Sequence, residues 1–300
     1  MKNRRSPLFY VGDKFKLVDQ ILPLCPENIE TYFEPFAGGG SLAMNMTANR
    51  VILNDIDSNV VGIHNWLLAQ ESLETLLNRL EGEIKRFGLK ASYLGDVVPD
   101  ELKVLRPKTY FAVQNRDAYN EMRAEFNSAE GKSPELLYLL LIFGFNRMLR
   151  FNRDGDFNVP VGNVDFNSNV VEALRDYLDW KSATEVVISN QDFLTFIRAG
   201  EPNERDFVYV DPPYLITQSE YNKIWAESDE SRLYGFLDDL DRAGVRWALS
   251  NVVTYKQSTN TVLEGWMTKY DVNFLKSNYI SYHNNSDKKP GEVLVRNYGD

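Results

Sequence analysis

The sequence is poor in the residues that build disulfide and metal sites, with one cysteine, Cys25, and two histidines, His64 and His283, among 300 residues. A single cysteine excludes an intrachain disulfide framework and a cysteine-based zinc cluster, and it suits a reducing, cytoplasmic compartment. The two histidines are too far apart in the chain for a local histidine-based metal motif, so we expect no metal ion.

Long apolar runs are also absent. The longest, residues 138–145, is well short of the roughly 20 apolar residues that a membrane helix needs. The basic first residues are not followed by the apolar stretch of a secretory signal. We therefore expect a protein that is neither exported nor bound to a membrane.

Acidic residues outnumber basic ones by 43 to 33, which gives a formal net charge of −10. This balance argues against a protein that binds polyanions nonspecifically through a basic surface, although a local basic face can still contact nucleic acid. Arg147, Arg150 and Arg153 form one candidate face. The same arginines also fit a solvated loop that Asp154 and Asp156 partly neutralise, so charge alone leaves both interpretations open.

The pattern of apolar residues divides the chain into three blocks. Residues 1–66 and 179–300 alternate strands and helices, which predicts a parallel sheet with crossover helices. Residues 67–178 have helical spacing and end in a candidate hairpin at about 145–162. We therefore predict an α/β fold in which a mainly helical domain is inserted into a sheet domain. The expected strands are Asn28–Phe33, Val51–Leu53, Val186–Ile188, Phe207–Val210 and Trp247–Ser250, and the expected helices of the sheet domain include 42–48 and 231–242.

The most informative stretch is Asp211-Pro212-Pro213-Tyr214, which follows the apolar run 207–210. The run predicts a buried strand, and the two prolines end it. A carboxylate and an aromatic ring therefore leave the carboxyl end of a strand, where open α/β sheets bind ligands. Because proline has no N–H group, nearby carbonyls can accept hydrogen bonds from a substrate amine. This suits chemistry on the exocyclic amine of a base, and an acidic strand-end turn without a catalytic role is the alternative.

A glycine turn, residues 38–40, separates the first expected strand from the helix that Ser41 would cap. Such a turn lets the backbone approach a ligand closely. No Gly-Lys-Ser/Thr follows and the dinucleotide fingerprint is missing, so a triphosphate or a nicotinamide cofactor is not expected. Asp55, near the end of the next strand, can accept from ribose hydroxyls. S-adenosylmethionine is a ligand of this kind, and a purely structural turn is the alternative.

Several motifs, in this order and with a helical insert between them, resemble the Dam family (alpha-group, D12 class) of DNA adenine-N6 methyltransferases. Tyr10-Val11-Gly12-Asp13-Lys14 stands where the family has Trp-Ala-Gly-Gly-Lys, so Asp13 replaces a glycine. The hairpin is similar to the family's target-recognition hairpin, and the closing stretch 292–298 is similar to the end of Dam-like enzymes from restriction systems. The other motifs are 33–40 (Phe-Glu-Pro-Phe-Ala-Gly-Gly-Gly), 54–57 (Asn-Asp-Ile-Asp) and 211–214.

The resemblance implies a class I, Rossmann-like methyltransferase sheet that binds S-adenosylmethionine, built from residues 1–66 and 179–300, with a target-recognition domain at 67–178. In the family pattern Lys14 and Tyr10 border the methionine end of the cofactor and Asp55 its ribose. Asp192 and Phe193 match the pair that contacts its adenine. The full implied set is Tyr10, Lys14, Phe36, Ala37, Gly38, Gly40, Asp55, Asp192, Phe193 and Asp211.

The resemblance also implies the reaction. The lone pair of adenine N6 is delocalised into the ring, so this amine is a poor nucleophile. Asp211 and the carbonyl of Pro212 would each accept one N6–H and localise the lone pair toward the methyl group. Pro213 shapes the turn, and Tyr214 would stack on a base flipped out of the duplex. Positioning and fixed dipoles would then supply most of the catalysis.

The hairpin carries the implied contacts to double-stranded DNA. Phe145 resembles the aromatic residue that the family inserts beside the target, and Arg150 the arginine that reads a guanine. This implies GATC or a related site, with a cognate restriction endonuclease as the partner suggested by the likeness to restriction systems. Arg147 replaces a glycine and would add a phosphate contact or change the recognition geometry. The full implied set is Phe145, Asn146, Arg147, Met148, Arg150, Asn158 and Pro160; for Phe145, a place in the core is the alternative.

Two other classes of protein are alternatives to a DNA adenine-N6 methyltransferase. RNA or protein methyltransferases of the same fold often carry Asn-Pro-Pro-Tyr and lack the arginine hairpin, so Asp211 and Arg150 argue against them. A catalytically silent DNA-binding module would have no reason to keep both Lys14 and Asp211.

Overall fold

The computed structural model describes residues 2–217, 225–276 and 291–299. The chain packs into two compact units. Unit 1 comprises residues 1–3, 14–56 and 184–300, and unit 2 comprises residues 4–13 and 57–183. The division into a cofactor-binding domain and a target-recognition domain stays a prediction.

Unit 1 contains an eight-stranded sheet in the order β3-β2-β1-β4-β5-β8-β7, with β6 paired to β5. The first five strands in this order are parallel, and β8 is antiparallel to both β5 and β7. The strand order reverses between β1 and β4, where doubly wound sheets bind their ligands. The predicted α/β class I sheet is therefore confirmed. Its strands are β1 Ile29–Glu34, β2 Ala48–Asn54, β3 Glu185–Ser189, β4 Phe207–Val210, β5 Arg246–Tyr255, β6 Ser258–Thr259, β7 Asp271–Leu275 and β8 Gly291–Arg296.

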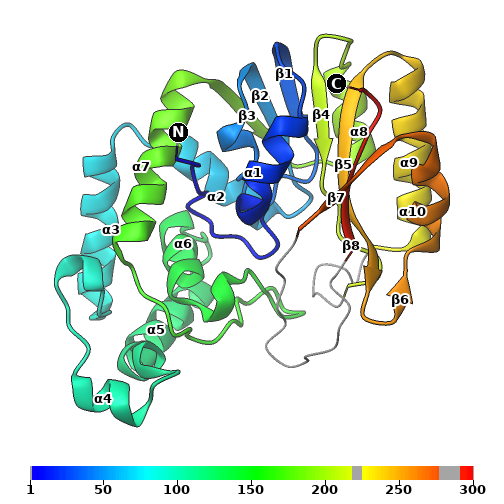
Figure 1. Cartoon of the computed structure of the whole chain (residues 1–300). Helices are drawn as coiled ribbons and strands as arrows, with labels where there is room; N and C mark the ends of the chain where they lie inside the picture. Colours follow the sequence, from blue (N-terminus) through cyan, green and yellow to red (C-terminus); the bar gives the residue numbers. More distant parts are fainter. Residues whose placement is uncertain (1, 218–224, 277–290, 300) are drawn as a thin grey trace. The chain divides into compact units, whose positions relative to one another are not determined.

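Three helices, α8 (Phe193–Gly200), α9 (Glu227–Arg242) and α10 (Thr261–Trp266), pack their apolar side chains into one core with the sheet. The strands contribute alternate residues to this core, as the pleat requires, among them Phe33, Val208, Val210, Trp247, Leu249, Val293 and Val295. Figure 1 shows α9 and α10 side by side. The shorter elements of unit 1 are η1 Phe15–Leu17, α1 Val18–Ile21, η2 Leu22–Leu24, η3 Ala43–Asn45 and η7 Met267–Lys269.

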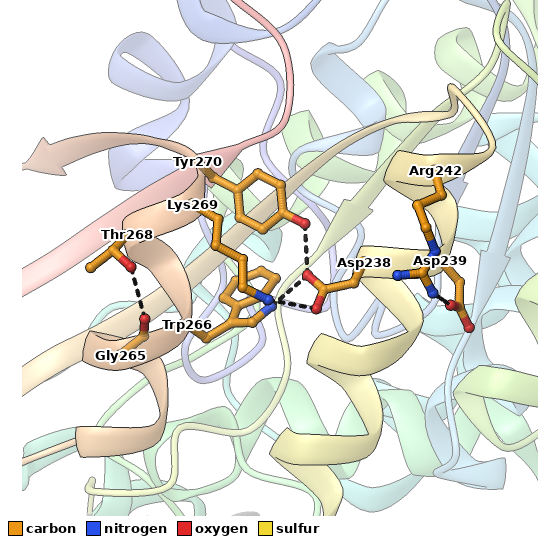
Figure 2. A network of polar contacts seen from close by, with 8 residues as sticks. All are labelled: Asp238, Asp239, Arg242, Gly265, Trp266, Thr268, Lys269 and Tyr270. Atoms are coloured by element: carbon orange, nitrogen blue, oxygen red, sulfur yellow. Dashed lines mark hydrogen bonds and ion pairs between the residues drawn. The ribbon is translucent and has the colours of Figure 1, made fainter.

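A polar network around Asp238 joins α9 to the end of α10 and the residues after it (Figure 2). Asp238 Oδ1 accepts from Trp266 Nε1 at 2.8 Å and from the Tyr270 hydroxyl at 2.6 Å. Asp238 Oδ2 accepts from Lys269 Nζ at 2.8 Å. The Trp266 ring also stacks on Tyr234 of α9, with ring centroids 4.3 Å apart. These contacts fix α10 against α9 by both its polar and its apolar groups.

One predicted helix is wrong. We expected a helix from Leu42 to about Ala48, but only the short 3₁₀ turn η3 forms there. Ala48 already belongs to β2, where it pairs with Ile29 of β1, and this pairing leaves no residues for a longer helix. The Asn45 side chain also donates to the carbonyl of Ser41 at 2.7 Å, a local bond that competes with helix formation.

Unit 2 is mainly helical. Its helix α6 is apolar on every side, and residues 136–143 are all buried, so this helix forms the centre of the unit. The Tyr138 hydroxyl donates to the carbonyl of Pro7 at 3.2 Å and ties the segment 4–13 to α6. The helices are α2 Ser58–Leu68, α3 Leu73–Phe87, α4 Asp100–Leu105, α5 Tyr110–Ser128, α6 Pro134–Phe143 and α7 Ser168–Ala183, with short turns η4 Ser92–Leu94 and η5 Phe145–Arg147.

Across both units, none of the described helices combines the length and the apolar character needed to cross a membrane.

Candidate functional site

Two of the motifs singled out from the sequence, 33–40 and 211–214, meet at the reversal point of the sheet in unit 1. Strand β1 ends at Glu34 and leads into the glycine turn, and β4 ends at Val210 and leads into Asp211. Because β1 and β4 are parallel neighbours, both segments leave the same edge of the sheet. This edge, at the carboxyl ends of the strands, is where open α/β sheets bind ligands.

Asp211 lies in a buried polar cluster with Lys14, Tyr214 and Glu292. Lys14 Nζ lies 2.6 Å from Asp211 Oδ2 and 3.9 Å from Glu292 Oε1. The Tyr214 hydroxyl lies 2.9 Å from Asp211 Oδ1 and 3.2 Å from Glu292 Oε1. Lys14 Nζ is also 5.0 Å from the centre of the Tyr214 ring, a cation–π distance. The predicted residues Lys14, Asp211 and Tyr214 are thus brought together, and Glu292 joins them.

Burial and charge act in opposite directions on Asp211. Burial raises the pKa of its carboxyl group, and the ammonium of Lys14 and the hydroxyl of Tyr214 counteract this rise. Only 4% of the Lys14 side chain and 17% of the Asp211 side chain are exposed, so solvent screens their attraction weakly. Lys14 therefore favours the ionised form of Asp211, in which the carboxylate can accept hydrogen bonds.

Glu34 adds another buried carboxyl group beside this cluster. It accepts from the Tyr32 hydroxyl at 3.0 Å. Burial raises the pKa of Glu34 to about 8, and the charge of Asp211 adds to the rise while Tyr32 and Lys14 oppose it. The site thus holds the carboxyl groups of Glu34, Asp211 and Glu292 together with the ammonium of Lys14. A cluster of this composition favours a ligand that carries positive charge.

Glu34 and Glu292 are the residues of the cluster that the sequence did not single out. Glu34 lies in the motif 33–40 and Glu292 in the closing stretch 292–298, but neither was predicted to have a role. A signal was present for Glu292, because an acidic residue within the apolar strand β8 is buried only where it has partners.

The glycine turn is held by the carboxylate of Asp55. The backbone N–H of Gly38 donates to Asp55 Oδ2 at 2.8 Å, and Gly38 and Gly40 have φ values of 48° and 70°. These angles are favourable only for glycine, which explains the residue type at both positions. Phe36 and Ala37 lie in the same turn, and the Ala37 N–H donates to the carbonyl of Asn54 at 2.8 Å. Asp55 thus shapes the turn, and its contact with a ribose stays a prediction.

Aromatic rings gather beside this turn. Phe36 lies 5.2 Å from Phe193 and 5.6 Å from Trp225, and Phe193 lies 5.7 Å from Trp225, measured between ring centroids. Asp192 caps α8, since its Oδ1 accepts from the N–H groups of Leu194 and Thr195 at 3.1 and 3.4 Å. Phe36 and Phe193 are among the residues predicted to bind the cofactor. Trp225 is not, and the sequence carries no separate signal for it.

Ile56 is a further candidate for contact with a ligand, and it was not predicted from the sequence. It follows Asp55 directly, and 63% of its side chain is exposed, which is unusual for isoleucine. The Asn190 side chain holds this position by donating to the carbonyls of Asp55 and Ile56 at 2.8 and 2.9 Å. Ile56 lies just after the carboxyl end of β2, where an exposed apolar side chain can pack against a flat apolar surface of a ligand.

The predicted DNA-contacting hairpin lies in unit 2, together with Tyr10. Its chains pair through isolated bridges between Gly144 and Val161 and between Phe151 and Phe157. The Asn127 side chain of α5 clamps the returning chain, because it accepts from the Phe157 N–H at 2.8 Å and donates to the Phe157 carbonyl at 3.0 Å.

Phe145 is 50% exposed, although the apolar run before it is buried as far as Phe143. The alternative that Phe145 is a core residue is therefore wrong. Its backbone is fixed, since the Phe145 N–H donates to the carbonyl of Pro160 at 2.8 Å. Asn146 and Pro160 are exposed and Met148 is partly exposed, so the hairpin presents them to solvent.

Arg150 is oriented by Asn158 across the hairpin. Arg150 Nε donates to Asn158 Oδ1 at 2.7 Å, and Arg150 Nη2 donates to the Asn158 carbonyl at 3.1 Å. In return the Asn158 N–H donates to the Arg150 carbonyl at 3.0 Å. These bonds leave the Nη1 end of the guanidinium for an outside acceptor.

Among the residues that the structure describes, no group of three or more histidine, cysteine, aspartate and glutamate side chains could hold a metal ion.

The sheet order and the Asp-Pro-Pro-Tyr turn at its reversal point define a class I methyltransferase fold. The chain belongs to the family of D12 class N6 adenine-specific DNA methyltransferases, whose family model matches residues 10–289. The resemblance seen in the sequence is thereby confirmed, and the family is a family of enzymes.

Two curated relatives of the chain are named as methylases. The chain is 32% identical, over 98% of its length, to the modification methylase StsI of Streptococcus sanguinis, and it covers 43% of that protein. It is 27% identical, over 71% of its length, to a DNA adenine methylase of Vibrio cholerae and covers 66% of it. Among solved structures, the rRNA methyltransferase AviRa of Streptomyces viridochromogenes matches 97% of this chain and 88% of its own, with 13% identity and a TM-score of 0.39. The chain thus spans less than half the length of StsI.

Proposed function

We propose that this chain transfers a methyl group from S-adenosylmethionine to N6 of an adenine in double-stranded DNA. The observation that carries the proposal is the position of Asp211, whose ionised carboxylate is supported by Lys14 at the reversal point of the sheet. A carboxylate at this place can accept a hydrogen bond from an exocyclic amine. The family and the names of the relatives supply the substrate class.

The charge of the site supports S-adenosylmethionine as the methyl donor. When bound, this cofactor supplies an electrophilic methyl group on a positively charged sulfur. The carboxyl groups of Glu34, Asp211 and Glu292 complement positive charge, and Lys14 can bind a carboxylate. The turn at Gly38 and Gly40 and the ring cluster around Phe193 are suited to a nucleoside. Tyr10, Lys14, Asp55 and Asp192 complete the proposed binding set.

The catalytic step follows from the geometry of Asp211. Its oxygens already accept from Lys14 and Tyr214, but each carboxylate oxygen has a second lone pair. Asp211 accepts one N6–H of the adenine and the Pro212 carbonyl accepts the other, which localises the nitrogen lone pair. The Tyr214 ring stacks on the flipped base while its hydroxyl keeps the ring fixed.

Recognition of the target falls to the hairpin. Phe145 fills the space that the flipped base leaves, offsetting part of an unstacking cost of a few kcal/mol. Arg150 reads a guanine, and Asn146, Met148, Asn158 and Pro160 belong to the same proposed set of DNA contacts. We propose GATC or a related sequence as the site. A cytoplasmic location and a restriction endonuclease that cuts the same site complete the proposal, since relatives of this chain are named modification methylases.

The test is direct. Purified protein is incubated with S-adenosylmethionine and unmethylated plasmid DNA, and modified bases are mapped by single-molecule sequencing. N6-methyladenine confined to one short motif supports the proposal and reveals the site. The variant Asp211→Ala should bind the cofactor and methylate nothing. Methylation of RNA but not of plasmid DNA, or full activity of Asp211→Ala, would overturn the proposal.

A further inference from the structure

Arg5, Phe9 and Arg147 form a cluster in unit 2 at the start of the hairpin. The guanidinium carbon of Arg147 lies 3.9 Å from the centre of the Phe9 ring, and that of Arg5 lies 4.6 Å from the same centre. Each cation is attracted to the ring, but the two cations repel one another. Two guanidinium groups on one ring concentrate positive charge at this place, which favours an anion.

The backbone of this cluster adopts a conformation that side chains rarely accept. Phe9, Asn146 and Arg147 have φ values of 47°, 53° and 50°. Left-handed residues other than glycine are sterically unfavourable and gather where a structure binds a ligand. The Dam-like pattern has a glycine at position 147, which would adopt this φ without strain. Arginine at this position therefore carries a backbone strain that glycine would avoid.

The guanidinium of Arg147 is partly withdrawn from water. Its Nε is buried and has no hydrogen-bond acceptor among the described residues. Burial lowers the pKa of Arg147 to about 10, and the charge of Arg5 acts in the same direction, whereas Tyr138 and Asp165 oppose it. A buried donor without an acceptor is unfavourable, and the low dielectric around it strengthens the attraction of the rest of the guanidinium for an anion.

We propose that Arg5 and Arg147 bind one phosphate of the DNA backbone beside the target. This inference rests on the proposed function. The oxygens of a phosphate can accept from two guanidinium groups at once and remove their repulsion, whereas a guanine edge is matched by the fork of one arginine. Phe145 is two residues away and exposed, so the phosphate contact would fix the register of the hairpin on the duplex.

The test measures the salt dependence of DNA binding by the full chain with and without Arg147. The probes are a labelled duplex that carries the mapped methylation site and an equally long duplex that lacks it. Dissociation constants of wild type and Arg147→Gly are measured on both over a series of KCl concentrations. We expect the slope of log affinity against log salt to become shallower by about 0.9, and the loss of affinity to be similar on the two duplexes.

Matched variants separate charge, shape and folding. Arg147→Gly should fold, because glycine accepts the φ of 50°, and its thermal unfolding is checked first. Arg147→Lys keeps the charge and should keep the slope. Arg116→Ala removes an exposed arginine of α5 and should change neither slope nor affinity.

The outcomes are distinct. An unchanged slope for Arg147→Gly on both duplexes overturns the phosphate site. A loss confined to the duplex with the target also overturns it and assigns Arg147 to base reading instead. Wild-type protein that binds neither duplex would overturn the proposed function itself, and this appears before any variant is measured.

Discussion

Lys14 Nζ lies 2.6 Å from Asp211 Oδ2, and this ion pair links the start of the segment 14–56 of unit 1 to the turn after β4. The residues are nearly 200 positions apart in the sequence, and both are largely buried. The partnership gives Lys14 a role toward Asp211 besides the cofactor contact expected from the sequence. Lys14 can therefore act in two ways, by binding the cofactor and by favouring the ionised form of Asp211, and experiments can distinguish the two.

Replacing Lys14 by methionine should remove the charge that holds down the pKa of Asp211. The buried carboxyl group would then be protonated over more of the pH range and could not accept from the substrate amine. We expect methylation at neutral pH to fall by about 10²-fold, the loss typical of one fixed catalytic charge. The acid limb of the pH–rate profile should also move to higher pH. Lys14→Arg keeps the charge and serves as the control; a profile that is the same in Lys14→Met and wild type contradicts this role.

Glu292→Gln should weaken cofactor binding more than DNA binding. Glu292 Oε1 lies 3.2 Å from the Tyr214 hydroxyl and 3.9 Å from Lys14 Nζ, and glutamine keeps an acceptor while removing the charge. We expect KM for S-adenosylmethionine to rise about tenfold, or about 1.4 kcal/mol, with KM for DNA little changed. Steady-state kinetics with each substrate varied in turn measure both values. Glu185→Gln, at a carboxylate that is 63% exposed on β3, is the matched control.

The raised pKa of Glu34, about 8, predicts that cofactor binding releases a proton. A positively charged ligand favours the ionised form of Glu34 and lowers its pKa in the complex. Between the two pKa values the free protein holds a proton that the complex has lost, so affinity should strengthen as pH rises toward 8 and level off above it. Calorimetry in two buffers of different ionisation enthalpy counts the released protons. In Glu34→Gln the pH dependence should disappear; if it persists, another group is responsible.

Arg150→Ala should relax discrimination at one guanine of the recognised site, by about 1–3 kcal/mol if the contact is bidentate. Asn158→Ala removes the side-chain acceptor that orients Arg150, so it should produce a smaller loss at the same base. Methylation rates on duplexes substituted one position at a time would show this. Arg153→Ala, at the exposed tip of the hairpin, is the control for charge. Loss at several positions equally would point to a phosphate contact instead.

The sequence was informative where a local pattern determines structure. The strand Phe207–Val210 was predicted to the residue, because apolar side chains fill it and prolines end it. Lys14, Asp211 and Tyr214 were predicted from their positions in motifs, and their side chains do contact one another. The helix expected after Ser41 failed because pairing of Ala48 with a distant strand overrode the local signal.

What the sequence could not reveal depends on neighbours that are distant along the chain. The ring of Trp225 joins Phe36 and Phe193 only through the fold, and nothing in its own surroundings predicts this. Likewise, the raised pKa of Glu34 arises from burial and from Asp211, which lies on another strand end. Both depend on the tertiary fold rather than on a local motif.

Asp238→Asn should destabilise unit 1 through the network that joins α9 to the end of α10. Burial alone would raise the pKa of Asp238, but hydrogen bonds from Lys269, Tyr270 and Trp266 outweigh it, and the pKa is lowered. A carboxyl group whose pKa is lower in the folded state stabilises the fold above its unfolded pKa, and this contribution is lost as pH falls through the folded value.

We therefore expect Asp238→Asn to lower the free energy of unfolding by about 1–3 kcal/mol at pH 7, and the difference from wild type to shrink in acid. Urea unfolding at pH 7 and near pH 3 measures both effects. Asp239→Asn is the matched control, because Asp239 is the next residue on α9, its side chain is 57% exposed, and its ion-pair partner is Arg242 one turn away (Figure 2). Exposed pairs of this kind contribute little, so Asp239→Asn should unfold like the wild type at both pH values. Equal destabilisation by the two substitutions would contradict the prediction. It would mean that the loss of stability comes from removing one negative charge from α9 and not from the hydrogen bonds of Asp238.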